Sequence, residues 1–264
     1  MEFHIMGGDG RQLLLADFLR RRGFTVTASY LGGDQPPRWG ADVLVLPLPC
    51  TKDGERLHAP MVAQELALRE AFEQFRGRMI FGGMLPGYAP RSAIDYYRAE
   101  EVLITNAALT AENALALAIS KTPFALAGSP VLVLGGGRIG RLLALKLKAL
   151  GAKVTVAARR EETIALCRAL GCDGMLYEDV PYHRYRLVLN TVPSQVLDRE
   201  RLAMLPREAV LIELASAPYG FDGDEAKKMG LRVCDGASLP GKYCPETAAA
   251  VIGEYILKEM ERHG

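Results

Sequence analysis

Residues 131–140 read VLVLGGGRIG, a run of apolar residues followed at once by a glycine-rich turn. The glycines match G-x-G-x-x-G, a helix pattern follows over 141–150, and an apolar stretch at 153–157 completes a strand–turn–helix–strand unit. In such a unit the first glycine permits the turn, the second lets the backbone approach a pyrophosphate, and the third allows close packing. The helix N-terminus offers free N–H groups to the phosphates. We therefore predict a Rossmann-type dinucleotide site at Gly135, Gly137, Arg138, Ile139 and Gly140.

The end of the second strand favours NADP over NAD. The residues there are Ala158, Arg159 and Arg160, and none of them is a carboxylate. An Asp or Glu at this place holds the ribose hydroxyls of NAD and repels a 2′-phosphate, whereas a guanidinium can bind phosphate through two hydrogen bonds. The alternative is that both arginines are solvated surface residues, with Glu161 and Glu162 weakening the local field.

Further apolar runs at 187–190, 209–212 and 232–234 predict more strands of the same parallel sheet. Ligands of open parallel sheets lie at the carboxyl ends of the strands, so the residues after these runs should border the nicotinamide half. The residues expected at the cofactor are Thr191, Val192, Pro193, Ala215 and Pro240. The alternative for each is an ordinary turn at a strand end.

The first part of the chain has the same strand–turn–helix plan. A strand at 3–6 leads through GGDGRQ (7–12) to a helix at 13–22 and a second strand at 24–30. The alternation continues with a strand at 42–47, a helix at 60–76, a strand at 78–82 and residues 96–105. The stretch TAENALALAIS (110–120) predicts a helix capped by Thr110. We expect an α/β domain over 1–120, a cofactor domain over 121–244, and a last helix at 245–263 that packs on the first domain.

Length and composition agree with two soluble domains. The chain has 264 residues, just under two domains at about 150 residues each. A net charge of +1 gives no bulk attraction to nucleic acid or to an anionic membrane, so neither is expected as a partner. Glycine and proline break the longest charge-free run, 122–137, so no membrane span or signal peptide is predicted. Five cysteines without C-x-x-C and four scattered histidines indicate reduced thiols, no metal site and a cytoplasmic protein.

The distribution of catalytic residue types disfavours 2-hydroxy acid dehydrogenase chemistry. That reaction needs a histidine acid/base and an arginine for the substrate carboxylate, and the strand ends of the second half supply neither. Polar residues instead gather in 8–12, 106–113 and 236–245, where Arg11 and Lys242 could receive a carboxylate and Asp9, Glu112 or Tyr243 could handle a proton. The alternative for each is a helix cap or a surface residue. The predicted catalytic residues are Asp9, Arg11, Glu112 and Lys242, and the predicted substrate-binding residues are Gly10, Arg11, Gln12, Thr110, Ser216, Gly241 and Lys242.

Several stretches together resemble one known family. They are GGDGRQ (7–12), ADVLVLPLP (41–49), TNAALTAENALALAI (105–119), the cofactor unit at 131–159, LNTVPS (189–194), ELASAPYGFD (213–222) and GASLPGKYCPETAA (236–249). The chain resembles the A-subunit family of dipicolinate synthase from spore-forming bacteria, over essentially its whole length. The first and last of these stretches are far more specific than the dinucleotide turn.

The resemblance implies two Rossmann-like doubly wound domains with the active cleft between them, as in the formate and glycerate dehydrogenase class. It implies an NADP-linked oxidation of dihydrodipicolinate, or its hydrated precursor, to pyridine-2,6-dicarboxylate during sporulation. It also implies a flavoprotein-like partner, the B subunit of dipicolinate synthase, in the mother-cell cytoplasm, and it allows a homo-oligomer. The sequence departs from the family pattern at 217–220, which reads APYG, and at 110–113, which reads TAEN.

The expected chemistry agrees with the residues present. Oxidation of a dihydropyridine removes a hydride and a proton and yields an aromatic ring, so positioning the dianion matters more than a strong base. Arg11 and Lys242 suit that role. Two alternatives stay open: a 2-hydroxy acid or amino acid dehydrogenase of the same fold, and a non-catalytic NADP-binding scaffold in which Arg11, Glu112 and Lys242 would be dispensable.

Overall fold

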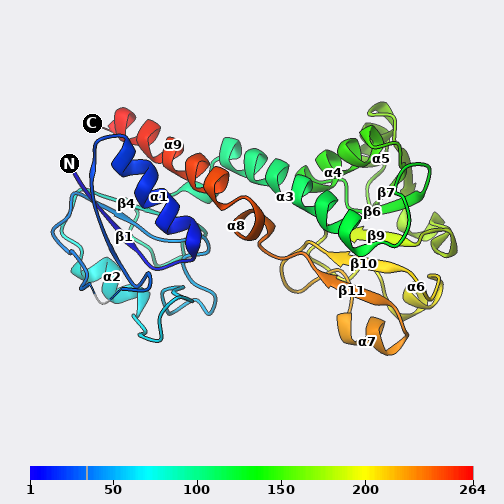
Figure 1. Ribbon diagram of the computed structural model, residues 1–264, viewed down its shortest axis with the longest axis horizontal. Helices are drawn as coiled ribbons and strands as arrows, with labels where there is room; N and C mark the ends of the chain where they lie inside the picture. The colour runs from blue at the N-terminus through cyan, green and yellow to red at the C-terminus, as the bar shows by residue number, and fades with distance from the viewer. Residues whose placement is uncertain (34, 264) are drawn as a thin grey trace. The chain divides into compact units, whose positions relative to one another are not determined.

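The computed structural model describes residues 1–33 and 35–263, and it divides the chain into two compact units (Figure 1). The first unit comprises Met1–Asn106 and Pro240–Gly264, and the second comprises Ala107–Leu239. Each unit is built on one parallel sheet covered by helices. The predicted fold class of two parallel α/β domains is therefore confirmed.

The first unit holds a five-stranded parallel sheet in the order β2-β1-β3-β4-β5. Its elements are β1 (Glu2–Met6), α1 (Gly10–Arg21), β2 (Thr25–Ser29), β3 (Val43–Val45), α2 (Leu68–Gln74), β4 (Met79–Gly82), β5 (Ile94–Asp95), the 3-10 turn η1 (Tyr96–Arg98), α8 (Leu239–Tyr243) and α9 (Pro245–His263). The chain leaves β1 toward β2 on one side and returns to β3 on the other. The space above the carboxyl ends of β1 and β3 is therefore the topological switch point of this sheet.

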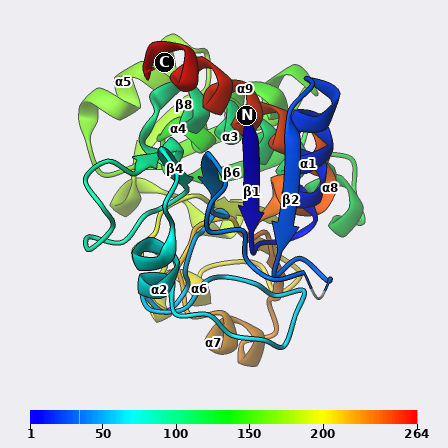
Figure 2. The same cartoon turned by 90° about the vertical axis from the view of Figure 1, so that its left-hand side faces the viewer.

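The C-terminal helix α9 packs beside α1 on this sheet (Figures 1 and 2). Apolar residues of α9, among them Ile252 and Ile256, share one core with Leu15 of α1 and Ile5 of β1. The two helices approach closely at Gly253, because a Cβ there would lie 2.5 Å from the Phe18 ring.

The second unit holds a six-stranded parallel sheet in the order β11-β10-β9-β6-β7-β8. Its elements are α3 (Glu100–Lys121), β6 (Pro130–Leu134), α4 (Arg138–Ala149), β7 (Lys153–Ala158), α5 (Glu161–Ala169), β8 (Asp173–Leu176), the 3-10 turns η2 (Tyr177–Asp179) and η3 (Tyr182–Arg184), β9 (Leu187–Asn190), α6 (Arg199–Ala203), β10 (Val210–Glu213), α7 (Gly223–Lys228) and β11 (Arg232–Asp235).

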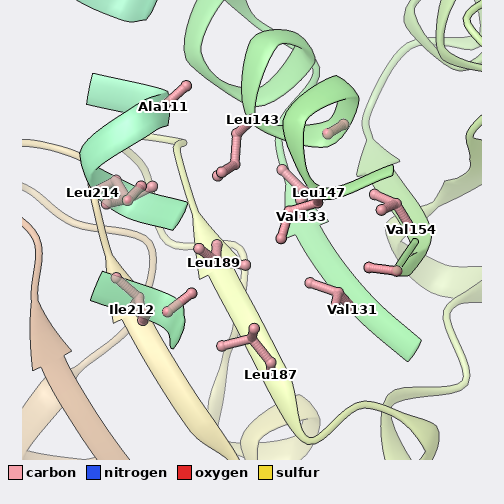
Figure 3. Close-up of a cluster of buried hydrophobic side chains, with 14 of the residues drawn as sticks. Ala111, Val131, Val133, Leu143, Leu147, Val154, Leu187, Leu189, Ile212 and Leu214 are labelled. Atoms are coloured by element: carbon pink, nitrogen blue, oxygen red, sulfur yellow. The ribbon is translucent and has the colours of Figure 1, made fainter. Parts of the chain in front are cut away.

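Both faces of this sheet are buried, which explains why its strands are continuously apolar. Along β6, Val131 and Val133 enter one core while Leu132 and Leu134 enter the other, as the period of two requires. Figure 3 shows the first of these cores, where side chains of β6 and β9 meet Leu143 and Leu147 of α4.

The helix α3 differs from its predicted form. It begins at Glu100 rather than Thr110, and the buried Val102 and Ala107 extend its apolar face before Thr110. Thr110 is therefore a buried mid-helix residue and no cap. The part after Asn106 packs through Ala111, Ala114 and Leu117 into the core of the second unit. The division between the units therefore falls inside α3 and not at residue 120. By length and composition α3 is long and apolar enough to cross a membrane, and in the structure its residues Ala111, Ala114 and Leu117 pack into the core of the second unit.

The predicted helix at 60–76 is also wrong for its first half, since α2 spans only Leu68–Gln74. The preceding residues form a loop that closes on itself. Leu57 N donates to Leu66 O at 2.9 Å, and Arg56 and Ala67 form an antiparallel bridge. These contacts between distant residues decide the conformation, and local helix propensity does not.

Candidate functional site

The glycine turn after β6 has a different physical reason for each glycine. Gly135 has φ +95°, and a Cβ on it would lie 2.6 Å from Thr191 Oγ1. A Cβ on Gly140 would overlap the carbonyl oxygen of Gly135, so α4 can pack this closely only with glycine there. Gly137 is different, because no atom lies within 4 Å of its Cβ position and it begins α4 without any side-chain cap. Open space in front of bare helix N–H groups fits a pyrophosphate.

A pocket of about 470 Å³ opens over this turn. Its lining residues are Gly135, Gly136, Gly137, Ala158, Arg159, Arg160, Thr163, Tyr177, Thr191, Val192, Pro193, Ser194 and Val196. The structure thus gathers much of the predicted cofactor set around one pocket, and its described lining includes no carboxylate. The geometry and the charge both suit a dinucleotide phosphate.

The two arginines at the end of β7 are exposed and available. Within the described chain the guanidinium groups of Arg159 and Arg160 make no hydrogen bond or ion pair. Tyr177 lies near them in the pocket wall, where burial raises the pKa of its hydroxyl although Arg159 and Arg201 act in the opposite direction. Arg159 and Arg160 can therefore bind an anion in this pocket without breaking an existing contact to the described residues.

A buried carboxylate joins the two loops that follow β9 and β10. Glu213 Oε1 accepts hydrogen bonds from Asn190 Nδ2 at 2.6 Å and from Ala215 N at 2.9 Å, and its Oε2 accepts one from Gly220 N at 2.9 Å. Asn190 in turn fixes the pocket loop, because its Oδ1 accepts from Val192 N and its Nδ2 donates to Val192 O. Burial raises the pKa of Glu213, and these hydrogen bonds limit the rise.

The remaining predicted cofactor residues do not line the pocket. Arg138 and Ile139 form the first turn of α4, where Ile139 packs against the core. Ala215 is buried and donates to Glu213, so it shapes the loop. Pro240 belongs to the first unit, in α8.

In the first unit, Asp9 and Arg11 form a tight pair at the start of α1. Arg11 Nε donates to Asp9 Oδ1 at 2.9 Å, and Nη2 donates to Asp9 Oδ2 at 2.8 Å and to Leu48 O at 2.7 Å. Burial would raise the pKa of Asp9, but hydrogen bonds and charge from Arg11 outweigh it and hold that pKa below its usual value. The pair therefore stays ionised. Two of the three guanidinium nitrogens of Arg11 are thus occupied, and only Nη1 has no hydrogen-bond partner among the described residues.

The predicted residues around this pair have varied surroundings. Gly241 packs on the guanidinium, with its Cβ position 2.8 Å from Arg11 Nε, and Gly10 and Lys242 are exposed. Gln12 is 1% exposed, and neither polar atom of its side-chain amide has a hydrogen-bond partner within the described chain.

The catalytic and substrate-binding residues predicted in the second unit differ in their exposure to solvent. Glu112 is exposed, and its carboxylate makes a surface ion pair with Lys146 Nζ at 3.5 Å. Thr110 is buried in α3, and Ser216 is exposed after β10. Among residues 1–33 and 35–263 no group of three metal-ligating side chains is present.

Comparison with known proteins shows which proteins the chain resembles. Residues 2–96 match the model of the N-terminal domain of the dipicolinate synthase A subunit, and residues 103–219 match the NAD-binding domain of D-isomer specific 2-hydroxyacid dehydrogenases. The A subunit of dipicolinate synthase from Bacillus subtilis (strain 168) is 27% identical over 98% of this chain and 95% of its own. The crystal structure of the corresponding A subunit from Bacillus halodurans has a TM-score of 0.84 and 27% identity, covering 97% of this chain and 96% of that one. The chain is thus similar to dipicolinate synthase A subunits over nearly its whole length.

More distant structures share the fold alone. D-Lactate dehydrogenase from Escherichia coli has a TM-score of 0.65 at 12% identity, over 100% of this chain and 98% of that one. A dehydrogenase-type domain that binds a nicotinamide cofactor is supported for the second unit by the family match over residues 103–219.

Several pocket residues were not predicted from sequence. Gly136, Thr163 and Tyr177 depend on tertiary contacts: the Thr163 methyl packs where a Gly136 side chain would be, and Tyr177 follows a strand paired with β7. Ser194 is the last residue of the stretch 190–194 that was expected to border the nicotinamide half, and Val196 lies two residues beyond it, so a wider window would have included Val196.

Proposed function

We propose that this chain is the NADP-dependent oxidoreductase subunit of a dipicolinate synthase, which oxidises dihydrodipicolinate to pyridine-2,6-dicarboxylate. The observation that carries the proposal is the 470 Å³ pocket, where an open glycine turn meets two arginines and the described lining has no carboxylate. Similarity to dipicolinate synthase A subunits over nearly the whole chain supports the substrate assignment. If the hydrated precursor is the true substrate, it must first lose water.

The cofactor preference follows from charge. A 2′-phosphate adds a dianion at the end of β7, where Arg159 and Arg160 can neutralise it with charge-assisted hydrogen bonds. An NAD-specific site would present a carboxylate there, and the described lining has none. We propose Thr191, Val192 and Pro193, held by the Asn190–Glu213 link, for the nicotinamide half of the cofactor.

Each part of the chemistry has candidate groups in this chain. A nicotinamide held in the pocket would supply the hydride acceptor, and the substrate ring would also lose a proton as it becomes aromatic. In the first unit we propose Gly10, Gln12, Gly241 and Lys242 for the dicarboxylate, together with Arg11, whose orientation Asp9 fixes and whose Nη1 is left to donate. In this arrangement the positive charges of Arg11 and Lys242 orient the dicarboxylate.

The chain should act with a second protein, as the A-subunit designation of its relatives implies. The second candidate function is that of a D-2-hydroxy acid dehydrogenase, favoured by the match over residues 103–219. That reaction needs a histidine acid/base and a carboxylate-binding arginine. In the second unit the loops after β9 and β10 supply neither.

The test is reconstitution. The purified chain is mixed with its partner protein, with dihydrodipicolinate generated in the cuvette, and with NADP⁺ or NAD⁺ in parallel reactions. We expect dipicolinate and reduced cofactor with NADP⁺, and a much slower reaction with NAD⁺. Failure to reduce either nucleotide would contradict the proposal, and activity on lactate or glycerate instead would favour the second candidate. Dipicolinate formation that is unaffected by substitution of Arg11 and Lys242 would favour the scaffold alternative.

A further inference from the structure

The carboxyl end of the first sheet has the features of a ligand site of its own. In doubly wound sheets ligands bind where the strand order reverses, and here that point lies between β1 and β3. The loop after β1 holds Gly7, Gly8 and Asp9, and the loop after β3 contributes Leu48 O, which accepts from Arg11. Both loops therefore meet at the Asp9–Arg11 pair.

An unsatisfied buried side chain lies at the same place. Gln12 Oε1 is 2.6 Å from the Cβ position of Gly8, and the whole amide has no hydrogen-bond partner among the residues described. A buried amide without partners costs about 1–3 kcal/mol, a cost that fold stability alone does not favour. An orphaned polar group at a switch point indicates a site shaped for a polar ligand.

The loop 57–66 brings a histidine to this point. Gly8 N donates to His58 O at 2.7 Å, and His58 N donates to Cys50 O at 2.8 Å, so the His58 backbone is held against both switch-point loops. The half-buried His58 lines a second pocket, of about 270 Å³, whose charged lining residues are Lys52, Arg56, Asp53 and Glu65. Arg56 is paired with Glu65, whereas Lys52 makes no hydrogen bond or ion pair within the described residues.

We propose that His58 is the catalytic residue that accepts the proton released when the dicarboxylate substrate is oxidised, an inference that rests on the proposed function. Two neighbouring ring C–H bonds break. One hydrogen leaves with its electron pair to the oxidised nicotinamide, and the other passes as a proton to an imidazole nitrogen of His58. The electron pair of the second bond becomes the new ring double bond. The imidazolium then returns its proton to water, with Lys52 beside it to attract the anionic substrate.

The surrounding charges keep this imidazole ready to act as a base. Burial lowers the pKa of His58, the charges of Lys52 and Arg11 lower it further, and the charge of Asp9 raises it. The net shift is downward, so the imidazole is neutral at pH 7. A bound dianion would raise that pKa again, and this favours proton transfer to His58 only when substrate is present.

The first test is kinetic and uses the chain together with its partner protein. His58→Gln should lower kcat by about 10²- to 10⁴-fold with NADPH affinity unchanged, and it should remove the loss of activity at low pH. In His58→Ala, added imidazole should restore part of the rate. The matched control is His183→Gln, an exposed histidine in η3, which should keep the wild-type rate. A His58→Gln enzyme with wild-type kcat and pH profile would overturn the proposal.

The second test needs no variant. In the wild-type chain, the imidazole signals of His58 are titrated by NMR with and without dipicolinate. We expect the pKa of His58 to rise when dipicolinate binds. Bound dipicolinate that leaves the pKa of His58 unchanged would overturn the inference. If the wild-type protein reduces no nucleotide at all, the proposed function has failed, and this is distinct from failure of the role of His58.

Discussion

Substitution of Gly137 by alanine tests whether this glycine is needed for cofactor binding rather than for folding. The backbone at Gly137 has φ −73°, which alanine adopts without strain, and its Cβ position has no neighbour within 4 Å. Alanine is a poorer helix N-cap than glycine by roughly 0.5–1 kcal/mol. Its lower freedom in the unfolded chain offsets this by about 0.4–1 kcal/mol. The free energy of unfolding without cofactor should therefore change by less than about 0.5 kcal/mol.

Cofactor binding should respond quite differently. The new methyl group points into the space in front of α4 that the pyrophosphate needs, so hydrogen bonds from the turn to the phosphate are lost. Hydrogen bonds to a charged group are worth about 1.5–3 kcal/mol, so NADPH should bind roughly 10- to 150-fold more weakly. The assay is a fluorescence titration with NADPH, combined with urea unfolding of the same variant.

Two control variants define the result. Gly87→Ala places a methyl group in equally open space in the first unit and should change neither quantity. Gly140→Ala forces the Cβ against Gly135 O and should reduce both stability and binding. If Gly137→Ala binds NADPH as tightly as the wild type, the assignment of the turn to the pyrophosphate is refuted.

Three further predictions concern the cofactor preference, the loop link and the acid stability. Replacing both Arg159 and Arg160 by alanine should weaken NADPH binding by about 1–3 kcal/mol and leave NADH binding unchanged, as measured by parallel titrations; equal losses for both would contradict the 2′-phosphate assignment. Glu213→Gln turns an amide N–H toward Ala215 N–H or Gly220 N–H, so urea unfolding should show a loss of about 1–3 kcal/mol, and an unchanged midpoint would refute the link. Burial, followed by the charge of Arg38, lowers the pKa of His4 from 6.5 to about 4. The unfolded chain therefore takes up this proton first as the pH falls. The stability from His4 is complete above pH 6.5 and is lost by about 3 kcal/mol down to pH 4, and His4→Gln should remove that part of the wild-type pH dependence.

The parts of the fold that sequence predicted are those decided by neighbouring residues. The turn at Gly135, Gly137 and Gly140 depends on ten consecutive positions, and its context of strand and helix is local. The strands of the second sheet are continuous apolar runs in the sequence, and such runs indicate strands buried on both faces. The position of Arg159 and Arg160 at the end of β7 could be predicted in the same way, because the strand–turn–helix–strand unit is short.

The parts that sequence did not predict depend on contacts between distant residues. The Glu213–Asn190 link joins residues 23 positions apart, and His58 reaches Gly8 only because the loop 57–66 closes on itself. The start of α3 was misplaced because Thr110 looks like a cap, whereas the apolar pattern before it continues the helix. The pairing of Arg11 with Asp9 was not predicted, because it depends on the bidentate geometry that the start of α1 creates.

The most direct measurement of the central claim follows both products in one reaction mixture. The chain and its partner protein are supplied with dihydrodipicolinate and NADP⁺, and NADPH and dipicolinate are quantified over the same time course. We expect the two products to appear together in a one-to-one ratio, and we expect Gly137→Ala to slow both equally at low NADP⁺. Dipicolinate that accumulates without NADPH would contradict the claim that this chain is the NADP-dependent oxidoreductase.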